Sequence, residues 1–193
     1  MKILVVRKEG GLYTPTTNDV DYLITVQALE GATYEIDPQG YEVDLFKDFY
    51  KISGLLSNLK TASAQLYTVA SVFRTENDLD ECLLLNEKKE VIEGISHNLF
   101  MIDKEGALVT PPLESGCLKG VMRKQVLGLA EELGWEVKEE AFSPFALQKA
   151  RELFLTNTIR GIQWVRQYRK KSYPGDYAAE LIKKLNARIL LGG

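Results

Sequence analysis

The stretch TPPLESGCLKGVMR, residues 110–123, joins an apolar strand pattern to an amphipathic helix pattern. Prolines and glycines separate the two patterns, and the helix begins near Gly120 with almost no side-chain cap. The backbone N–H groups of Val121 and Met122 therefore have no acceptor within the helix. Together with the positive end of the helix dipole, they suit an anion, best of all a phosphate. The alternative is a plain helix start satisfied by water, which the local sequence alone favours.

Further strand and helix patterns extend on both sides of this stretch. Strands are expected at 2–7, 22–29, 41–49, 81–86, 90–94, 97–103, 107–112 and 135–142, and twice within 151–168 around a polar turn. Helices are expected at 61–77, at 120–133, at 143–150 with Ser143 as N-cap and Pro144 at the first helical position, and after Pro174 and Gly175. This order predicts one mixed α/β domain with hairpins, not a strict βαβ alternation.

Composition excludes several classes of function. The chain has 193 residues, a formal net charge of −3 and a pI near 5.4, which argue against a dedicated nucleic-acid binder. No apolar run is long enough to span a bilayer. Cys82 and Cys117 are expected to be reduced thiols of a cytoplasmic protein. The chain has no CxxC or HExxH pattern, so no zinc site is expected, and the single histidine, His97, is interpreted as a loop residue.

Three other positions could carry chemistry, and each has a plain alternative. Lys60 directly precedes a helix pattern, where the dipole disfavours its protonated form and favours a nucleophilic amine; it could equally be an exposed lysine. Glu93 ends an apolar strand and needs a partner if buried, such as a protonated ring nitrogen; it could equally face solvent. The sequence TNT, residues 156–158, could hold a phosphate or could be a turn that bonds its own backbone.

These features are informative in combination. A nucleophilic lysine, a carboxylate for a pyridinium nitrogen and two phosphate-holding turns are the protein groups that pyridoxal 5′-phosphate requires. The carboxylate keeps the ring nitrogen protonated, so that the ring can accept electrons from a substrate carbanion. The phosphate sites fix the ring so that the lysine meets the aldehyde carbon.

The order of these motifs resembles a known family. The segments DECLLLN, VIEG…NLF, TPPL…G.L.GVMR and FLTNT..GIQWV are collinear with class IV aminotransferases, from about residue 55 to residue 165. These are the fold-type IV enzymes, which include branched-chain and D-amino acid aminotransferases and aminodeoxychorismate lyases. The resemblance implies a mixed α/β fold with a strand-rich pseudo-barrel core, in which residues 1–193 form the cofactor-side domain. It also implies that the family's N-terminal small domain is largely absent from the chain.

Site residues follow from the resemblance position by position. It makes Lys60 the Schiff-base lysine and proton shuttle, and makes Glu93 the partner of the pyridine nitrogen. The other cofactor-binding residues that it implies are Ser96 near the cofactor, Leu118 on one ring face, Val121 and Met122 through backbone N–H groups at the phosphate, and Asn157 and Thr158 completing the phosphate cup.

The sequence also departs from the family pattern. Ser63 stands where an asparagine is usual, Gln65 where some members have a tyrosine, and Met122 where a threonine is common. Tyr67 is two residues further along the helix and is expected to face elsewhere.

The activity implied by the resemblance is transamination between an amino acid and a 2-oxo acid, in a cytoplasmic homodimer. Two alternatives stay open at this point. One is an aminodeoxychorismate lyase, which eliminates pyruvate with the same cofactor. The other is a non-catalytic remnant that keeps the fold.

Overall fold

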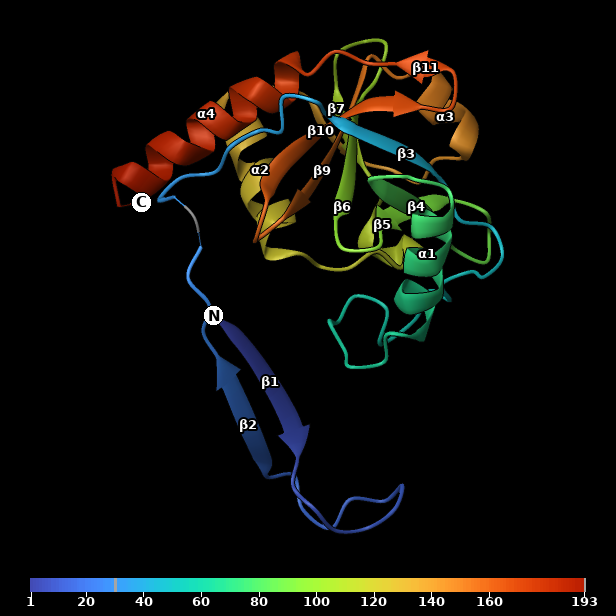
Figure 1. Cartoon of the computed structure of the whole chain (residues 1–193), viewed down its shortest axis with the longest axis vertical. Helices are drawn as coiled ribbons and strands as arrows, with labels where there is room; N and C mark the ends of the chain where they lie inside the picture. The colour runs from blue at the N-terminus through green and yellow to red at the C-terminus, as the bar shows by residue number, and fades with distance from the viewer. Residues whose placement is uncertain (30, 193) are drawn as a thin grey trace. The chain divides into compact units, whose positions relative to one another are not determined.

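The computed structural model describes residues 1–29 and 31–192, which form two compact units, Met1–Ala32 and Thr33–Gly193. The first unit is a hairpin of β1 (Lys2–Arg7) and β2 (Val20–Thr25), shown in blue in Figure 1. The strand expected at 2–7 is confirmed. The strand expected at 22–29 instead runs from Val20 to Thr25, because its register is set by pairing with β1, from Lys2 opposite Thr25 to Arg7 opposite Val20.

The second unit contains a nine-stranded mixed sheet and four α-helices (Figure 1). Its strands are β3 (Tyr41–Leu45), β4 (Glu81–Leu85), β5 (Val91–Gly94), β6 (Asn98–Ile102), β7 (Leu108–Thr110), β8 (Val137–Glu139), β9 (Glu152–Asn157), β10 (Gly161–Tyr168) and β11 (Lys171–Ser172). Its helices are α1 (Gln65–Glu76), α2 (Val121–Glu132), α3 (Pro144–Lys149) and α4 (Asp176–Leu190), with a 3-10 turn at Leu113–Ser115.

The sheet closes on itself. Strand β10 pairs with β3, and the order continues through β4 and β5 to β6. Strand β9 then pairs with both β6 and β10, which completes a ring. The expectation of a mixed α/β fold with a barrel-like, strand-rich core is confirmed. The interpretation of residues 1–193 as one cofactor-side domain stays a prediction, and the chain is described as two units.

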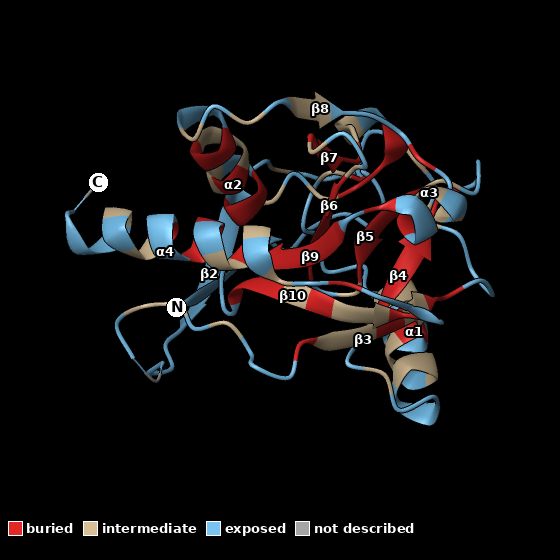
Figure 2. Ribbon diagram, turned by 90° about the horizontal axis from the view of Figure 1, so that it is seen from above, coloured by how far each residue is buried: buried red, intermediate tan, exposed pale blue. Residues whose placement is uncertain are grey.

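Both faces of the barrel strands are buried, which explains their continuous apolar runs. Along β6, Leu99 and Met101 contribute to one core cluster, whereas Phe100 and Ile102 contribute to another. Strand β9 alternates in the same way, with Leu155 in the first cluster and Phe154 in the second. Figure 2 shows these strands as buried, whereas α4 exposes one side to solvent.

Helices cover the face of the strands that carries Phe100 and Phe154. The second cluster includes buried residues of α2 and α4, and a third cluster joins α1 to β4 and β5. The first cluster therefore lies on the opposite face of the strands, inside the ring. Leu147 of α3 and Phe142 of the loop after β8 also belong to this cluster. Below, "outer face" means the face of the barrel that α1 and α2 cover.

The expected helices are all present, with shifted ends. The helix expected at 61–77 begins only at Gln65, after Ala64, whose φ of −116° is not helical. The helix expected at 120–133 is α2, with Gly120 as its N-cap. Ser143 and Pro144 hold the expected positions at the start of α3, although the Ser143 side chain makes no capping hydrogen bond. The strands expected at 41–49 and 135–142 are shorter than predicted.

No helix among the described residues has both the length and the apolar character that crossing a membrane requires.

Candidate functional site

Three polar residues form a row across neighbouring strands. Glu93 on β5 lies opposite Asn98 on β6, and Asn98 lies opposite Thr156 on β9. Directly opposed residues of antiparallel strands project to the same face. All three side chains are nearly inaccessible to solvent. Since Thr156 shares the face of Phe154, which belongs to the cluster under α2, the row lies on the outer face.

An irregularity in β5 turns Glu93 outward. Strict alternation would place Glu93 on the same face as Val91, which belongs to the cluster inside the ring. The pairing with β4 shifts, however, between Leu84 and Leu85. Glu93 therefore lies opposite Leu84, whose side chain packs under α1 on the outer face. A bulge of this kind re-aims a side chain without changing the strand's sequence pattern.

Glu93 is buried, and both of its carboxylate oxygens accept hydrogen bonds. Its Oε1 accepts hydrogen bonds from the Lys51 ammonium at 2.6 Å and from the Tyr67 hydroxyl at 2.9 Å. Its Oε2 accepts one from the backbone N–H of Leu118 at 2.6 Å. The solvent-facing alternative for Glu93 is thus excluded. The expectation that Tyr67 faces elsewhere is wrong, because the first turns of α1 direct its hydroxyl at Glu93. Burial, followed by the Glu93 charge, raises the pKa of Tyr67 and keeps it a hydroxyl donor.

Sequence reasoning missed Lys51. Lys51 follows the end of β3 by six residues; its backbone bridges in parallel to Asn86 and donates its N–H to the Leu85 carbonyl at 2.9 Å, at the end of β4. Its side chain is 11% exposed. Lys51 lies in a segment without helical or strand periodicity, and its partner is far away in the sequence. No local pattern marks Lys51, because its place is set by the bridge to Asn86 at the end of β4.

The segment before α2 packs directly on this row. The Asn98 amide donates to the Leu118 carbonyl at 2.8 Å. A Cβ at Gly120 would lie 2.0 Å from Asn98 Oδ1, so only glycine allows the helix to start this close to the strand. Among the residues that the structure describes, no side-chain hydrogen bond caps α2. Val121 is 67% exposed and Met122 is 5% exposed. The bare helix start expected from the sequence is confirmed.

Thr156 has a hydroxyl that lacks a partner. The residue is 1% exposed, and its Oγ1 makes no hydrogen bond within the described part of the chain. Its neighbour on the same face is Asn98, which contacts the N-cap residue Gly120. Thr156 is therefore one strand away from the residue on which the start of α2 packs, on the same face of the barrel. A buried hydroxyl without an acceptor or donor partner costs about 1–3 kcal/mol, and a bound anion would remove this cost.

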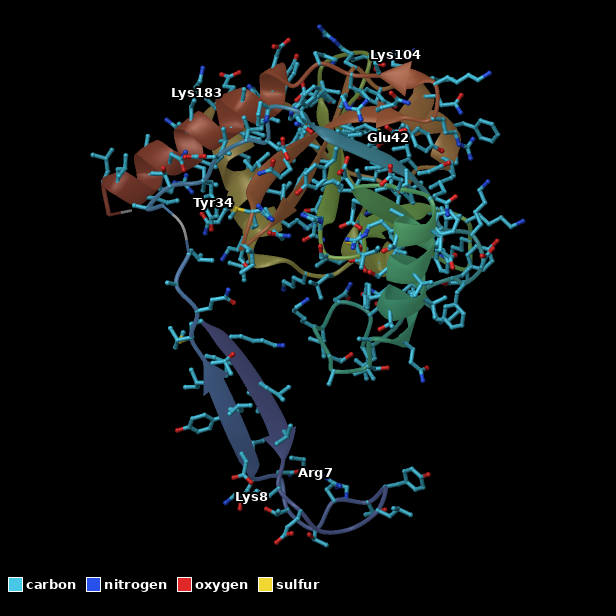
Figure 3. The ribbon with its side chains drawn as sticks, in the orientation of Figure 1. Arg7, Lys8, Tyr34, Glu42, Lys104 and Lys183 are labelled. Carbon is cyan, nitrogen blue, oxygen red and sulfur yellow. The ribbon has the colours of Figure 1, made fainter. Side chains whose placement is uncertain are left out.

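The turn between β9 and β10 is built by Asn157. Its Oδ1 accepts the N–H groups of Ile159 at 2.9 Å and Arg160 at 2.7 Å, as in the self-bonded turn that was the plain alternative. Its amide also donates to the Ser96 carbonyl at 3.2 Å, which joins this turn to the β5–β6 turn. Thr158 is exposed, and its carbonyl accepts the hydroxyl of Tyr34, labelled in Figure 3, at 3.0 Å.

Ser96 and His97 belong to a polar cluster around Glu81. The Glu81 Oε2 contacts His97 Nδ1 at 2.5 Å and accepts the Ser96 hydroxyl at 3.2 Å. His97 lies in the turn between β5 and β6, as expected of a loop residue, but it is only 9% exposed because Glu81 holds its ring inward. Ser96 is exposed. Cys82 and Cys117 are buried free thiols, as expected.

Lys60 lies in the loop before α1 and is exposed. Within the described residues, no hydrogen bond or ion pair joins it to Glu93. The loop is nevertheless attached to the segment before α2. The Asn58 side chain donates to the Cys117 carbonyl at 2.7 Å, and the Asn58 carbonyl accepts the Lys119 N–H at 3.0 Å. Two residues span at most about 7 Å, so the Lys60 backbone lies near Leu118.

No group of three or more His, Cys, Asp or Glu side chains able to hold a metal ion occurs among residues 1–29 and 31–192. The site is thus defined by a buried carboxylate, an uncapped helix start, an unpartnered hydroxyl on the same face of the barrel, and two lysines nearby.

Sequence comparison identifies the family. Residues 1–168 match the amino-transferase class IV family, and the chain belongs to it. The protein of Methanocaldococcus jannaschii described as a branched-chain-amino-acid aminotransferase is 38% identical over 111 residues, which cover 58% of this chain and 38% of that protein. A relative from Thermotoga maritima with the same description is 36% identical over 117 residues, covering 58% of this chain and 42% of the relative. The matched region is less than half the length of these relatives.

Solved structures agree with the fold. A solved structure from Thermotoga maritima, described as a branched-chain amino acid aminotransferase, superposes with a TM-score of 0.73 at 27% identity; the match covers 91% of this chain and 63% of that one. The Escherichia coli branched-chain amino acid aminotransferase has a TM-score of 0.78 at 24% identity and covers 91% and 58%. A Legionella pneumophila protein described as a 4-amino-4-deoxychorismate lyase has a TM-score of 0.71 at 20% identity, which shows the fold alone. The resemblance stated from the motifs is confirmed.

Proposed function

We propose that this chain binds pyridoxal 5′-phosphate on the outer face of its barrel and serves in transamination between an amino acid and a 2-oxo acid. The observation that carries the proposal is the convergence of buried Glu93, the uncapped start of α2 and the unpartnered Thr156 hydroxyl on one face. Family membership supports the same reading.

The residues present fit the cofactor at both ends. The α2 start offers the N–H groups of Val121 and Met122 to a phosphate, and Thr156 offers a buried hydroxyl on the same face of the barrel. At the other end, Glu93 accepts a cationic N–H donor, since the Lys51 ammonium already bonds its Oε1. That ammonium stands in for a protonated ring nitrogen. All three contacts of Glu93 are made with donors, so its oxygens act as acceptors, as holding a ring N–H requires.

The bound cofactor supplies an electron-accepting ring that stabilises negative charge on a substrate carbon. The chain's own residues then have separate roles. Glu93 keeps a proton on the ring nitrogen. Lys60 provides the amine that attaches the cofactor and carries a proton to and from the substrate carbon. Leu118 packs on a ring face, Ser96 lies near the cofactor, and Asn157 and Thr158 shape the second phosphate turn.

The role of Lys60 is tested by trapping the attached cofactor. The protein is incubated with pyridoxal 5′-phosphate, reduced with borohydride, digested and mapped by mass spectrometry. The reduced cofactor is expected on the peptide that carries Lys60, and Lys60→Ala should abolish the label. Lys47→Ala, which removes another exposed lysine, is the matched control and should leave it intact. A label on Lys51, or no label at all, would refute the assignment.

The substrate class is part of the proposal. Transamination is favoured over pyruvate elimination because the relatives reported above are described as branched-chain aminotransferases. A branched-chain amino acid that converts the bound cofactor to its amine form would support this choice. Cofactor binding without any such half-reaction would favour the non-catalytic remnant. Assembly as a cytoplasmic homodimer stays a prediction from the family resemblance.

A further inference from the structure

The Lys51–Glu93 ion pair is built into the fold. The Lys51 backbone is fixed to β4 by its bridge to Asn86 and its hydrogen bond to the Leu85 carbonyl. This placement sends the side chain to Glu93 Oε1, at 2.6 Å, with side-chain exposures of 11% and 3%. The ammonium also lies 5.6 Å from the centre of the Tyr67 ring. Both the backbone and the side chain of Lys51 are thus held in place, unlike those of a surface lysine that reaches a carboxylate by chance.

The contacts leave little room on Glu93 for another cation. A carboxylate has about four lone-pair positions. Lys51 and Tyr67 occupy Oε1, and the Leu118 N–H occupies one position on Oε2. One position remains for a further donor. The charge of Glu93 is already balanced by Lys51, so a second cation at this carboxylate would leave a net positive charge in a nearly dry site.

We propose that Lys51 is the resident counter-ion of Glu93 and competes for this carboxylate with the cofactor's ring nitrogen. The inference rests on the proposed function, because it assumes that the ring nitrogen comes to Glu93. In the cofactor-free chain, the Lys51 ammonium contacts the buried carboxylate and fixes its orientation. Cofactor binding must either displace the ammonium or share Glu93 with it, and both reduce affinity. Lys51 is a positioning residue that sets how tightly the cofactor is held.

Removing the ammonium should therefore tighten binding. In Lys51→Met the carboxylate loses its counter-ion, and a protonated ring nitrogen would restore one. The dissociation constant for pyridoxal 5′-phosphate is expected to fall about tenfold, the effect of one charged contact in a buried site. The cofactor-free variant should also unfold at a lower temperature, and added cofactor should raise that temperature more than in the parent protein.

Lys51→Gln serves as a second variant in case Lys51→Met does not fold, because its amide can still donate to Glu93 without a charge. It should shift affinity in the same direction. Lys47→Met removes an exposed lysine close in sequence and should leave affinity unchanged. Affinity is measured by spectroscopic titration of the intact chain and needs no turnover.

A cofactor analogue isolates the ring nitrogen. In the analogue a C–H group replaces this nitrogen, so it cannot compete for Glu93. Lys51→Met should tighten binding of pyridoxal 5′-phosphate but not of the analogue. Equal affinity of the parent protein and both Lys51 variants for pyridoxal 5′-phosphate would overturn the inference, as would weaker binding by the variants. Failure of the parent protein and every variant to bind either compound would instead refute the proposed function, and the competition with it.

Discussion

The unpartnered hydroxyl of Thr156 allows a prediction in which stability and binding change in opposite directions. Thr156→Val replaces the hydroxyl by a methyl group of similar size at a position that is 1% exposed. Since Oγ1 has no hydrogen-bond partner among the described residues, its removal breaks no hydrogen bond. It also relieves the burial cost of an unsatisfied polar group, so the free energy of unfolding should rise by about 1 kcal/mol.

The same substitution should weaken phosphate binding. If Thr156 donates to a phosphate at the start of α2, its loss removes one hydrogen bond to a charged group, which contributes about 1.5–3 kcal/mol. The dissociation constant for pyridoxal 5′-phosphate should then rise at least tenfold. Urea unfolding without cofactor measures the first effect, and spectroscopic titration measures the second.

Thr110 provides the matched control. It is also 1% exposed and lies on β7, which pairs with β6, but its Oγ1 donates a hydrogen bond to the Leu99 carbonyl at 2.7 Å. Thr110→Val should therefore lower the free energy of unfolding by about 1 kcal/mol and leave cofactor affinity unchanged. If Thr156→Val destabilised the cofactor-free chain as much as Thr110→Val, the hydroxyl would have a structural partner. If cofactor affinity did not change, Thr156 would have no part in the phosphate site.

Three further predictions follow from other contacts. A Cβ at Gly120 would meet Asn98 Oδ1 at 2.0 Å, so Gly120→Ala should lower the free energy of unfolding, measured in urea, by about 1–3 kcal/mol. Gly128 has open space around it, so Gly128→Ala should raise this free energy by about 0.5–1 kcal/mol. Equal unfolding midpoints of the two variants would contradict the close contact at Gly120. The buried Glu152 carboxylate accepts hydrogen bonds from two backbone N–H groups at the start of α4, at 3.0 and 2.7 Å. Glu152→Ala should therefore lower the free energy of unfolding, measured by thermal unfolding, by about 2 kcal/mol. An unchanged transition temperature would argue against this helix cap. Burial raises the pKa of the Glu81 carboxyl, but the hydrogen bond and the charge of His97 outweigh burial and lower this pKa overall. Because the pKa of Glu81 is lower in the folded than in the unfolded chain, the His97–Glu81 pair stabilises the fold above the unfolded value of about 4.3. This stabilisation is lost as the pH falls through the folded-state pKa. Stability measured across this range should fall less steeply in His97→Ala, and an identical slope would exclude the pairing.

Local sequence patterns were sufficient for most of the fold. Apolar runs such as 81–86 and 97–103 predicted strands that are present, because a strand buried on both faces must be apolar throughout. Glycine and proline marked the ends of helices, and α2 begins at Val121 as expected. Strand ends were less accurate. Strand β2 ends at Thr25, opposite the first residue of β1, and β3 ends at Leu45, opposite Leu83 of β4; no local pattern encodes these partners.

The candidate site was predictable in kind but not in its contacts. The bare start of α2 follows from residues 117–121 alone, because orphan N–H groups are a property of any helix start without a cap. The direction of Glu93 does not, since alternation along β5 points it inward and only the shifted pairing with β4 turns it outward.

Long-range pairing also selected the partners. Lys51 reaches Glu93 because the chain after β3 runs beside β4, across 42 residues of sequence. His97 is held inward because its Nδ1 contacts the carboxylate of Glu81, which lies on β4, 16 residues earlier in the sequence. Residue type and periodicity fix which groups a segment can offer and which way a regular element would present them. Which of these groups meet depends on strand register and closure of the barrel, and these arise only when distant segments pack together.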